Sequence, residues 1–357
     1  MLVNASNLKA IFVNLRTVFN GAFATAPSQW QQVAMLVPST GRQNDYAWLS
    51  NFPRMRRWIG EKAVKALEAS KYTVVNDDFE ATVEVDRNDI EDDQLGIYKP
   101  QAEMAGFSAA QLPDEIVFEL VNRGFVEACY DGQYFFDTDH PVAGKSVTNK
   151  GTKKLSIASL AAAQTSYGAA RAAMKSMKDD EGRPLGITPD VLLVPPALED
   201  TANLLMTAER FGNDQNPYKD TAKVVVAPWL ISDTAWFLLD TTKPVKPFIY
   251  QERKKPAFVE QTDPQADDVF NRKKYKFGAE ARASGGYGFW QMAYGSTGTE
   301  AEPWPPRAKT ARRPRTSRPP TPPRPSPLRC RLLTRVCRTN PAASSSTQLA
   351  LHRRRGL

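Results

Sequence analysis

Few side chains in this chain have the type and spacing that chemistry requires. The segment Asp137-Thr138-Asp139-His140 offers carboxylate oxygens and one imidazole nitrogen, which are donors that metal ions accept. His140 is the only histidine in the first 300 residues. A lone motif of this kind is typical of an ordinary loop. An enzyme that uses Asp137, Asp139 and His140 is therefore the least favoured function for this chain.

Other catalytic signatures are incomplete. Gly144-Lys145-Ser146 matches the end of a phosphate-binding loop, but the glycine required five residues before Gly144 is replaced by Asp139. Cys129 lies late on a predicted apolar helix with no histidine close in sequence, which predicts a small buried hydrophobic residue. The sequence contains neither a Gly-x-Ser-x-Gly elbow nor a Cys-x-x-Cys pair. We therefore predict no catalytic residue, no metal site and no cofactor.

An acidic run at residues 86–93 raises the question of a calcium loop. Ile90 stands where the third ligand of such a loop should be, and Glu91 stands in place of its glycine. The pattern therefore fails. Acidic residues at the start of a helix, where they face the positive end of the helix dipole, are the better interpretation.

Charge is distributed unevenly along the 357 residues. The formal net charge is +8, but residues 301–357 contain 13 arginines and one lysine against one acid. The first 300 residues are therefore mildly acidic. The tail is rich in proline and lacks sustained apolar periodicity, so residues 299–357 are predicted to be disordered. It is either a basic segment that binds nucleic acid or an out-of-frame or fused reading of GC-rich DNA. The residues for polyanion contact would be Arg312, Arg313, Arg315, Arg353, Arg354 and Arg355.

Length and composition exclude several classes of protein. The chain is long enough for a substantial core, and no run of 18 apolar residues is present, so we predict no membrane partner. Polar residues interrupt the first segment, which argues against a signal peptide. Three cysteines are too few for a disulfide scaffold.

Apolar periodicity predicts an α+β protein without a repeating βαβ rhythm. Helices are expected at 4–20, ended by Gly21, at 113–130 with Pro113 in the first turn, at 154–178 and at 197–209. Strands are expected as a pair within 71–85 and at 189–194, 223–227, 234–239, 246–260 and 269–294.

Residues 38–60 combine aromatic and arginine side chains, which together give large contact area and oriented donors. Stacking on nucleic acid is the alternative, but flanking Asp45 and Glu61 weaken the basic field. We therefore predict a contact between protein subunits. Its residues are Trp48, Arg54, Arg56, Arg57 and Trp58.

Several stretches together resemble the major head subunits of Mu-like phages and prophages, a branch of the tailed-phage capsid proteins. They are NLKAIFVNLRTVFNGAF (7–23) with APSQW (26–30), VPSTGRQNDYAWLSNFPRMRRWIGE (37–61), VDRNDIEDDQLGIY (85–98) and PDEIVFELVNRGFVEACYDGQYFFDTDHPV (113–142). The similarity extends over about residues 1–298. Nothing in the family accounts for the Pro/Arg-rich tail.

The resemblance implies the Hong Kong 97 capsid fold. By analogy, residues 1–37 form an N-terminal arm and residues 38–85 an extended β-hairpin loop. Residues 86–140 and 245–298 form a peripheral domain with a long spine helix, and residues 141–244 form an axial domain. The implied function is self-assembly into hexamers and pentamers of an icosahedral phage head that encloses double-stranded DNA. The implied partners are other copies of the chain, scaffold, maturation protease and portal proteins, and packaged DNA. The implied location is the virion, after assembly in the bacterial host cytoplasm.

Overall fold

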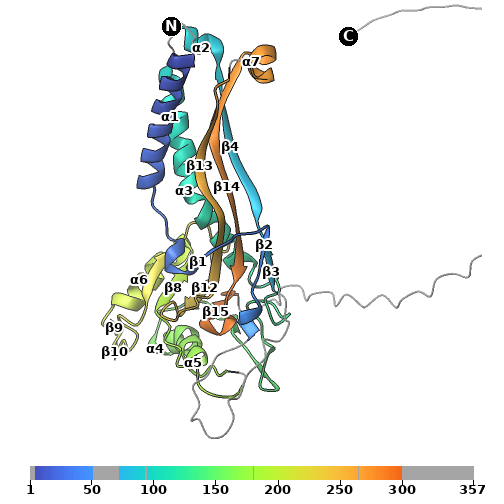
Figure 1. The fold of residues 1–357 in the computed structure, drawn as a ribbon. Helices are drawn as coiled ribbons and strands as arrows, with labels where there is room; N and C mark the ends of the chain where they lie inside the picture. The colour runs from blue at the N-terminus through green and yellow to red at the C-terminus, as the bar shows by residue number, and fades with distance from the viewer. Residues whose placement is uncertain (1–4, 51–71, 93–94, 180, 264, 300–357) are drawn as a thin grey trace, which may run out of the picture. The chain divides into compact units, whose positions relative to one another are not determined.

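The computed structural model describes residues 5–50, 72–92, 95–179, 181–263 and 265–299. The chain divides into two units, residues 1–306 and 307–357, and all the described helices and strands belong to the first. They occur in mixed order, which confirms the α+β class (Figure 1).

A long four-stranded sheet has the strand order β1-β13-β14-β4. β1 (Ala34–Pro38) runs parallel to β13 (Phe248–Gln261), and β14 (Lys274–Tyr287) pairs antiparallel with both β13 and β4 (Asp77–Asp86). The short helix α7 (Asp267–Arg272) joins β13 to β14. The register of β13 on β14 shifts between Glu252 and Lys254 and again between Lys254 and Ala257.

Two long helices, α1 (Ala5–Thr25) and α3 (Tyr98–Arg123), lie side by side against this sheet (Figure 1). The predicted stop at Gly21 was wrong, because α1 continues to Thr25. Pro113 was expected near the start of a helix, but it lies inside α3, which begins fifteen residues earlier at Tyr98. The buried residues of this earlier part are mostly small, so hydrophobic periodicity did not show them: Ala102, Ala105, Gly106 and Ala109.

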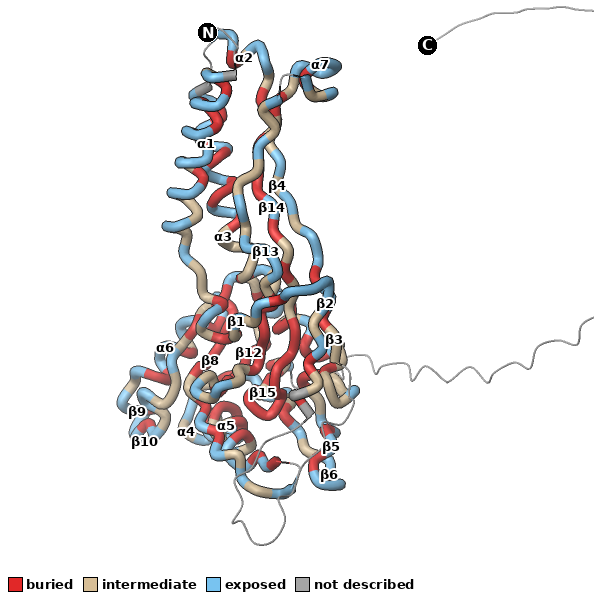
Figure 2. Tube along the Cα trace, in the orientation of Figure 1, coloured by how far each residue is buried: buried red, intermediate tan, exposed pale blue. Residues whose placement is uncertain are grey.

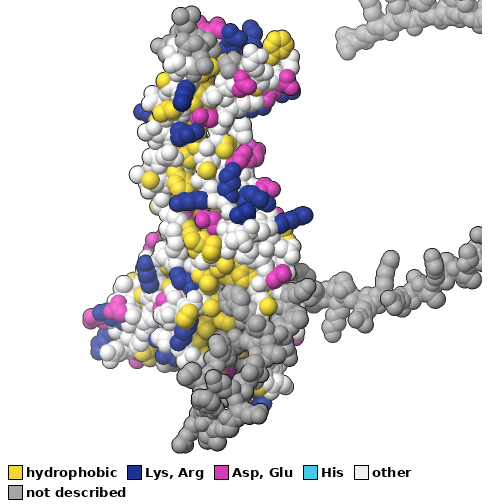
Figure 3. Space-filling model, in the orientation of Figure 1, with side chains coloured by type: hydrophobic (Ala, Val, Ile, Leu, Met, Phe, Trp, Pro, Cys, Tyr) yellow, Lys and Arg dark blue, Asp and Glu magenta, His cyan; other side chains and the backbone are white. Residues whose placement is uncertain are grey.

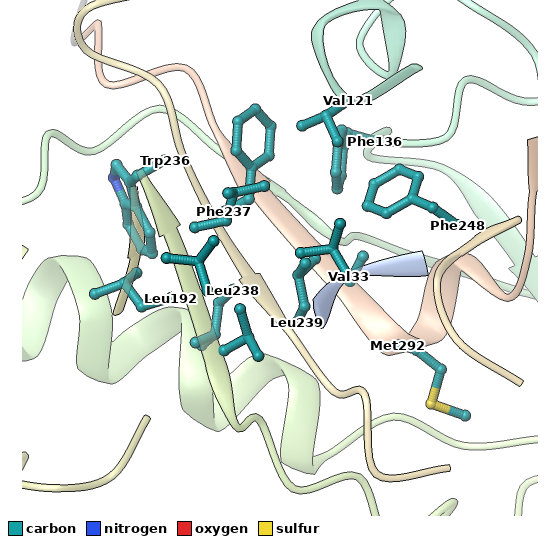
Figure 4. Packing of buried hydrophobic residues seen from close by; sticks show 14 of the residues in the cluster. Val33, Val121, Phe136, Leu192, Trp236, Phe237, Leu238, Leu239, Phe248 and Met292 are labelled. Carbon is teal, nitrogen blue, oxygen red and sulfur yellow. The ribbon is translucent and has the colours of Figure 1, made fainter. Parts of the chain in front are cut away.

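A second, five-stranded sheet has the order β11-β8-β12-β15-β7. Its strands are β7 (Lys150–Gly151), β8 (Val191–Val194), β11 (Lys223–Val226), β12 (Trp236–Leu239) and β15 (Ala293–Ser296). β8 and β12 are buried at every position, which is typical of central strands covered on both faces. This sheet packs into the largest apolar core, where Phe237, Phe136 and Phe248 converge (Figure 4).

Helices of the middle segment accompany this sheet. The predicted helix at 154–178 is shorter and composite: α4 (Leu160–Ala163), the π-helical segment η4 (Gln164–Gly168) and α5 (Ala169–Lys175). The start of α4 is fixed by Ser159, whose hydroxyl accepts a hydrogen bond from Ala162 N. After β8 follow the 3-10 turn η5 (Pro196–Leu198) and α6 (Glu199–Thr207), as the sequence predicted for this region. β9 (Arg210–Phe211) and β10 (Asp214–Gln215) form a small hairpin.

Short elements complete the unit. They are the 3-10 segments η1 (Trp30–Gln32), η2 (Ala47–Ser50), η3 (Leu95–Ile97) and η6 (Trp290–Met292), α2 (Arg87–Glu91), and the strands β2 (Gln43–Asp45), β3 (Thr73–Val75), β5 (His140–Val142) and β6 (Lys145–Val147). Asp86 caps α2 by accepting from Asn88 N, and this bond lowers the pKa of its carboxyl. The acidic run therefore begins a helix, as predicted.

The expected pair of strands within 71–85 does not form a hairpin. β3 pairs with β2, whereas β4 pairs along its whole length with β14. Residues 77–85, which the resemblance assigned to the extended loop, thus belong to the four-stranded sheet. Along β14, buried and partly exposed residues alternate over much of the strand, while the part around β8, β12 and β15 is almost wholly buried (Figure 2).

Candidate functional site: assembly elements

The base of the extended loop is a small antiparallel sheet. β2 and β3 pair in the register Gln43 with Val75 and Asp45 with Thr73. The residues between these strands, 51–71, lie outside the described part of the chain, and so do Arg54, Arg56, Arg57 and Trp58. The side chain of Trp48 is likewise not described. The aromatic and arginine contact therefore remains a prediction. β2 and β3 form the platform on either side of this segment.

A buried polar network fixes this platform to the long sheet. Gln251, on β13, is fully buried. Its Oε1 accepts a hydrogen bond from Tyr46 Oη at 2.7 Å, and its Nε2 donates to Asn76 Oδ1 at 2.7 Å and to the Val74 carbonyl at 3.2 Å. A satisfied polar network in a core holds a unique geometry, because each group has a single set of partners. Gln251 thus fixes both ends of the loop base.

The same network extends to the start of the loop. Asn76 Nδ2 donates to Ser39 Oγ at 2.9 Å and to the Gly41 carbonyl at 3.0 Å. Tyr72 adds a contact on the other side, since its hydroxyl accepts from Tyr287 N at 2.8 Å. Burial raises the pKa of the Tyr72 hydroxyl, which therefore stays protonated at neutral pH. Side-chain hydrogen bonds therefore hold β2, β3 and the residues next to them against the long sheet.

The predicted N-terminal arm begins with α1, which packs on α3. α3 corresponds to the long spine helix that the resemblance implies. One face of α1 is buried, and its residues there are Leu8, Ile11, Phe12, Leu15 and Phe19. Gly106 allows the helices to approach closely, because a Cβ at this position would collide with the Phe19 carbonyl oxygen. Further along, the Asp114 carboxylate accepts from Gln29 N at 2.9 Å and from Trp30 N at 2.7 Å. The spine helix therefore orients both the arm and the segment that follows it.

Several large apolar side chains remain exposed within the described residues. Met104 is 71% exposed and Phe107 is 42% exposed, and both line a groove between α1 and α3. Phe270 on α7 and Ile231 are each 84% exposed. Exposed apolar groups of this size are typical of surfaces that another protein covers.

Several charged side chains of the long sheet form ion pairs with one another or with α1. Lys254 Nζ lies 2.7 Å from Glu280 and Arg16 lies 3.1 Å from Glu260, and both signs are interspersed along this part of the surface (Figure 3). Such alternation gives no one-signed basic field of the kind that binds a phosphate backbone. The basic residues proposed for polyanion contact, Arg312 to Arg355, lie outside the described residues.

The segment Asp137–His140 does not form the metal-donor set that its sequence suggested. Asp137 accepts from Tyr134 N and Thr138 N, while His140 faces elsewhere and pairs with Asp131, with Nδ1 2.7 Å from Oδ2. Cys129 is buried, as predicted, but its Sγ also donates to Asp131 Oδ1 at 3.1 Å. Sequence distance was misleading, because the turn at Gly132, with φ of +85°, brings His140 back to Cys129. The sequence feature that could have predicted this cluster is a cysteine and an aspartate two positions apart, Cys129 and Asp131, directly before Gly132.

Two further sequence motifs have clear structural outcomes. Gly144, with φ of +77°, ends the turn between β5 and β6, and Lys145 and Ser146 begin β6. A phosphate loop would require a helix at this point. None of the helices in the described residues is long and apolar enough to cross a membrane.

Comparison with known proteins gives consistent matches along most of the chain. The family described as "Mu-like prophage major head subunit gpT" matches residues 8–158, 155–230 and 231–303. The major capsid protein of Escherichia phage Mu is 33% identical over 293 residues, which cover 82% of this chain and 74% of that protein. The Mu-like prophage FluMu major head subunit of Haemophilus influenzae is 35% identical over 82% of this chain and 73% of that protein.

Solved structures agree with these matches. The chain is similar to one from the procapsid of bacteriophage JBD30, with 32% identity and a TM-score of 0.53, covering 85% of this chain and 78% of the other. A chain of the bacteriophage JBD30 capsid gives 30% identity and a TM-score of 0.51, covering 64% of this chain and 99% of the other.

Proposed function

Because the chain belongs to the family of Mu-like prophage major head subunits, we propose that it assembles with copies of itself into hexamers and pentamers of an icosahedral phage head. The single observation that carries this proposal is the family match along residues 8–303. The chain shares the tailed-phage capsid fold with its relatives in phage capsids, which supports the same proposal.

The described part of the subunit offers several surfaces for self-association. They are the hydrogen-bonded strands β2 and β3, the helix α1 packed on α3, and the exposed apolar side chains Met104 and Phe270. Many modest contacts per subunit add up to a stable shell, because each further contact within an assembly is intramolecular. The division into arm, extended loop, peripheral domain and axial domain is part of this proposal.

The loop contact is the specific part of the proposal. Trp48, Arg54, Arg56, Arg57 and Trp58 would meet a neighbouring subunit, with the arginines pairing with its acidic side chains. Partners beyond the chain itself would be scaffold, maturation protease and portal proteins, with packaged double-stranded DNA at the inner surface. The subunit would act in the virion, after assembly in the host cytoplasm, and not as an enzyme.

Electron microscopy with light scattering tests this function. The full chain and a chain ending at Glu300 are purified and imaged under identical conditions. We expect shells, tubes or capsomer rings from both. Replacing Arg54, Arg56 and Arg57 by glutamate should abolish these particles, whereas the matched lysine replacements should retain part of the assembly because the charge is kept. Small monodisperse particles from the unmodified chain, even with scaffold present, would refute self-assembly.

A nucleic-acid-binding role of the tail is the second candidate, because residues 301–357 carry a formal charge of +13. DNA affinity that falls steeply with salt and disappears on truncation after Glu300 would support it. Equal affinity of the two chains would exclude it.

A further inference from the structure

Three potential metal donors converge beneath the turn that follows the spine helix. Cys129 Sγ, an oxygen of Asp131 and a ring nitrogen of His140 all lie within 4.8 Å of one another. Cys129 and Asp131 sit on one tight turn, closed by Cys129 N donating to the Gln133 carbonyl at 2.8 Å. His140 comes from the start of β5. The three side chains are thus supplied by two separate pieces of backbone.

The histidine ring is held in place but incompletely satisfied. His140 is fully buried and stacks on Trp290, with ring centroids 3.9 Å apart and an interplanar angle of 9°. Nδ1 is the ring nitrogen that faces the cluster, 2.7 Å from Asp131 Oδ2. Nε2 lies on the opposite edge of the ring and has no hydrogen-bond partner within the described residues.

The arrangement does not fit a nucleophilic site. In a Cys–His pair the imidazole accepts the proton of the thiol. In this cluster the Cys129 thiol donates to Asp131 instead, and burial beside that carboxylate raises the pKa of the thiol. The carboxylate stands between the two groups and would hinder proton transfer. Cys129 is therefore unsuited to act as a nucleophile.

The donor set fits a borderline-soft divalent ion. Sulfur and imidazole nitrogen favour zinc over magnesium or calcium. Zinc bonds of about 2.0–2.3 Å in a tetrahedron place neighbouring donor atoms about 3.3–3.6 Å apart. Sγ now lies 3.1 Å from Oδ1 and Nδ1 lies 2.7 Å from Oδ2, and the three donors lie within 4.8 Å of one another. To bind an ion, the carboxylate would rotate so that one of its oxygens faces the ion, and Sγ and Nδ1 would move closer together. A thiolate and a carboxylate would also balance the charge of the ion in this buried place.

We propose that Cys129, Asp131 and His140 form a structural zinc-binding site, with water in the fourth position. The ion would link the turn after α3 to β5 beside Trp290 and η6. It would replace two hydrogen bonds with coordinate bonds and so fix the end of the spine helix to the strand that follows. This role is independent of the shell-forming surfaces.

Cobalt binding to the full chain tests the site. In a variant carrying Cys330→Ser, Cys337→Ser and His352→Ala, Cys129 and His140 are the remaining thiol and imidazole. Titration with Co²⁺ alone should give one equivalent bound per chain and a thiolate-to-cobalt charge-transfer band, which Zn²⁺ then removes. Adding Asp131→Asn should weaken binding by at least about tenfold. Adding Cys129→Ser should remove the band.

X-ray absorption at the zinc edge provides a readout that needs no further substitution. The zinc-loaded parent variant should show one sulfur at about 2.3 Å and lighter donors at about 2.0 Å. Circular dichroism establishes that each protein is folded. A folded parent variant without the charge-transfer band, or a zinc spectrum without sulfur, would overturn the proposal. Binding that is undiminished by Asp131→Asn would overturn it as well.

Discussion

Replacing Gln251 by leucine should release the base of the extended loop while leaving the remainder of the sheet intact. The substitution preserves much of the side-chain volume but removes three hydrogen bonds, to Tyr46, Asn76 and the Val74 carbonyl. Each bond contributes about 1 kcal/mol, so the free energy of unfolding should fall by about 3 kcal/mol. The loss is concentrated on β2 and β3, because the three partners of Gln251 lie in or next to these strands.

Hydrogen exchange measures this effect locally. A loss of about 3 kcal/mol corresponds to roughly a hundredfold faster exchange if β2 and β3 open locally. We expect that increase at residues 43–45 and 73–75, and little change in β8 and β12. Urea unfolding of unassembled protein at fixed concentration gives the global value, since assembly would add its own stabilisation.

Tyr46→Phe is the matched control for Gln251→Leu. It removes one donor to Gln251 and should cost about 1 kcal/mol. The double variant should be less destabilised than the sum of the two single variants, because both remove the same bond. A change below about 0.5 kcal/mol in Gln251→Leu, with unaltered exchange in β2 and β3, would show that the network does not hold the loop base.

The remaining predictions concern the arm and the response to acid. Gly106→Ala should destabilise the chain by about 1–3 kcal/mol in urea unfolding and speed exchange in α1, because its Cβ would collide with the Phe19 carbonyl. Gly21→Ala, which meets open space within α1, should instead stabilise by about 0.5–1 kcal/mol; equal effects of the two would refute the close approach. Burial would raise the pKa of Asp179, but hydrogen bonds from Arg183 and Glu181 lower it overall. Its stabilisation is therefore present above about pH 4 and lost as the pH falls further, so Asp179→Asn should flatten unfolding stability against pH in that range, and an unchanged slope would contradict this.

Long segments with a strong apolar pattern could be predicted from the sequence. A helical segment that packs through small residues could not, because alanine and glycine give little apolar pattern. Leu8, Ile11 and Phe12 recur at helical spacing, so the helix α1 was evident. In contrast, the first half of α3 faces α1 with alanine and glycine, which carry little hydrophobic signal although Ala102 is fully buried. Pro113 is a residue type that favours the first turn of a helix, so the predicted helix began there and not at Tyr98.

The second limit on prediction was that contacts between residues distant in the sequence leave no local pattern. The alternation of residues 82–85 predicted a strand, but nothing local indicated that β4 would join β14 and not β3. The same limit applies to Cys129 and His140, which lie eleven positions apart and meet only because a glycine turn reverses the chain. The buried glutamine at 251 gave no signal, because its partners come from residues more than 170 positions away.

The two register shifts in β13 are positions at which the long β13–β14 hairpin can bend. Fourteen residues of extended strand span about 46 Å, and the irregular pairing at Glu252, Lys254 and Ala257 lies around the middle of β13. Bulges bend and twist a strand locally, so flexing should concentrate there. The seven residues that follow Lys254 to the end of β13 span about 23 Å, so a rotation of about 5° at Lys254 would displace that end by about 2 Å. A subunit built in this way can adapt its outer end to different neighbours while its core keeps one packing.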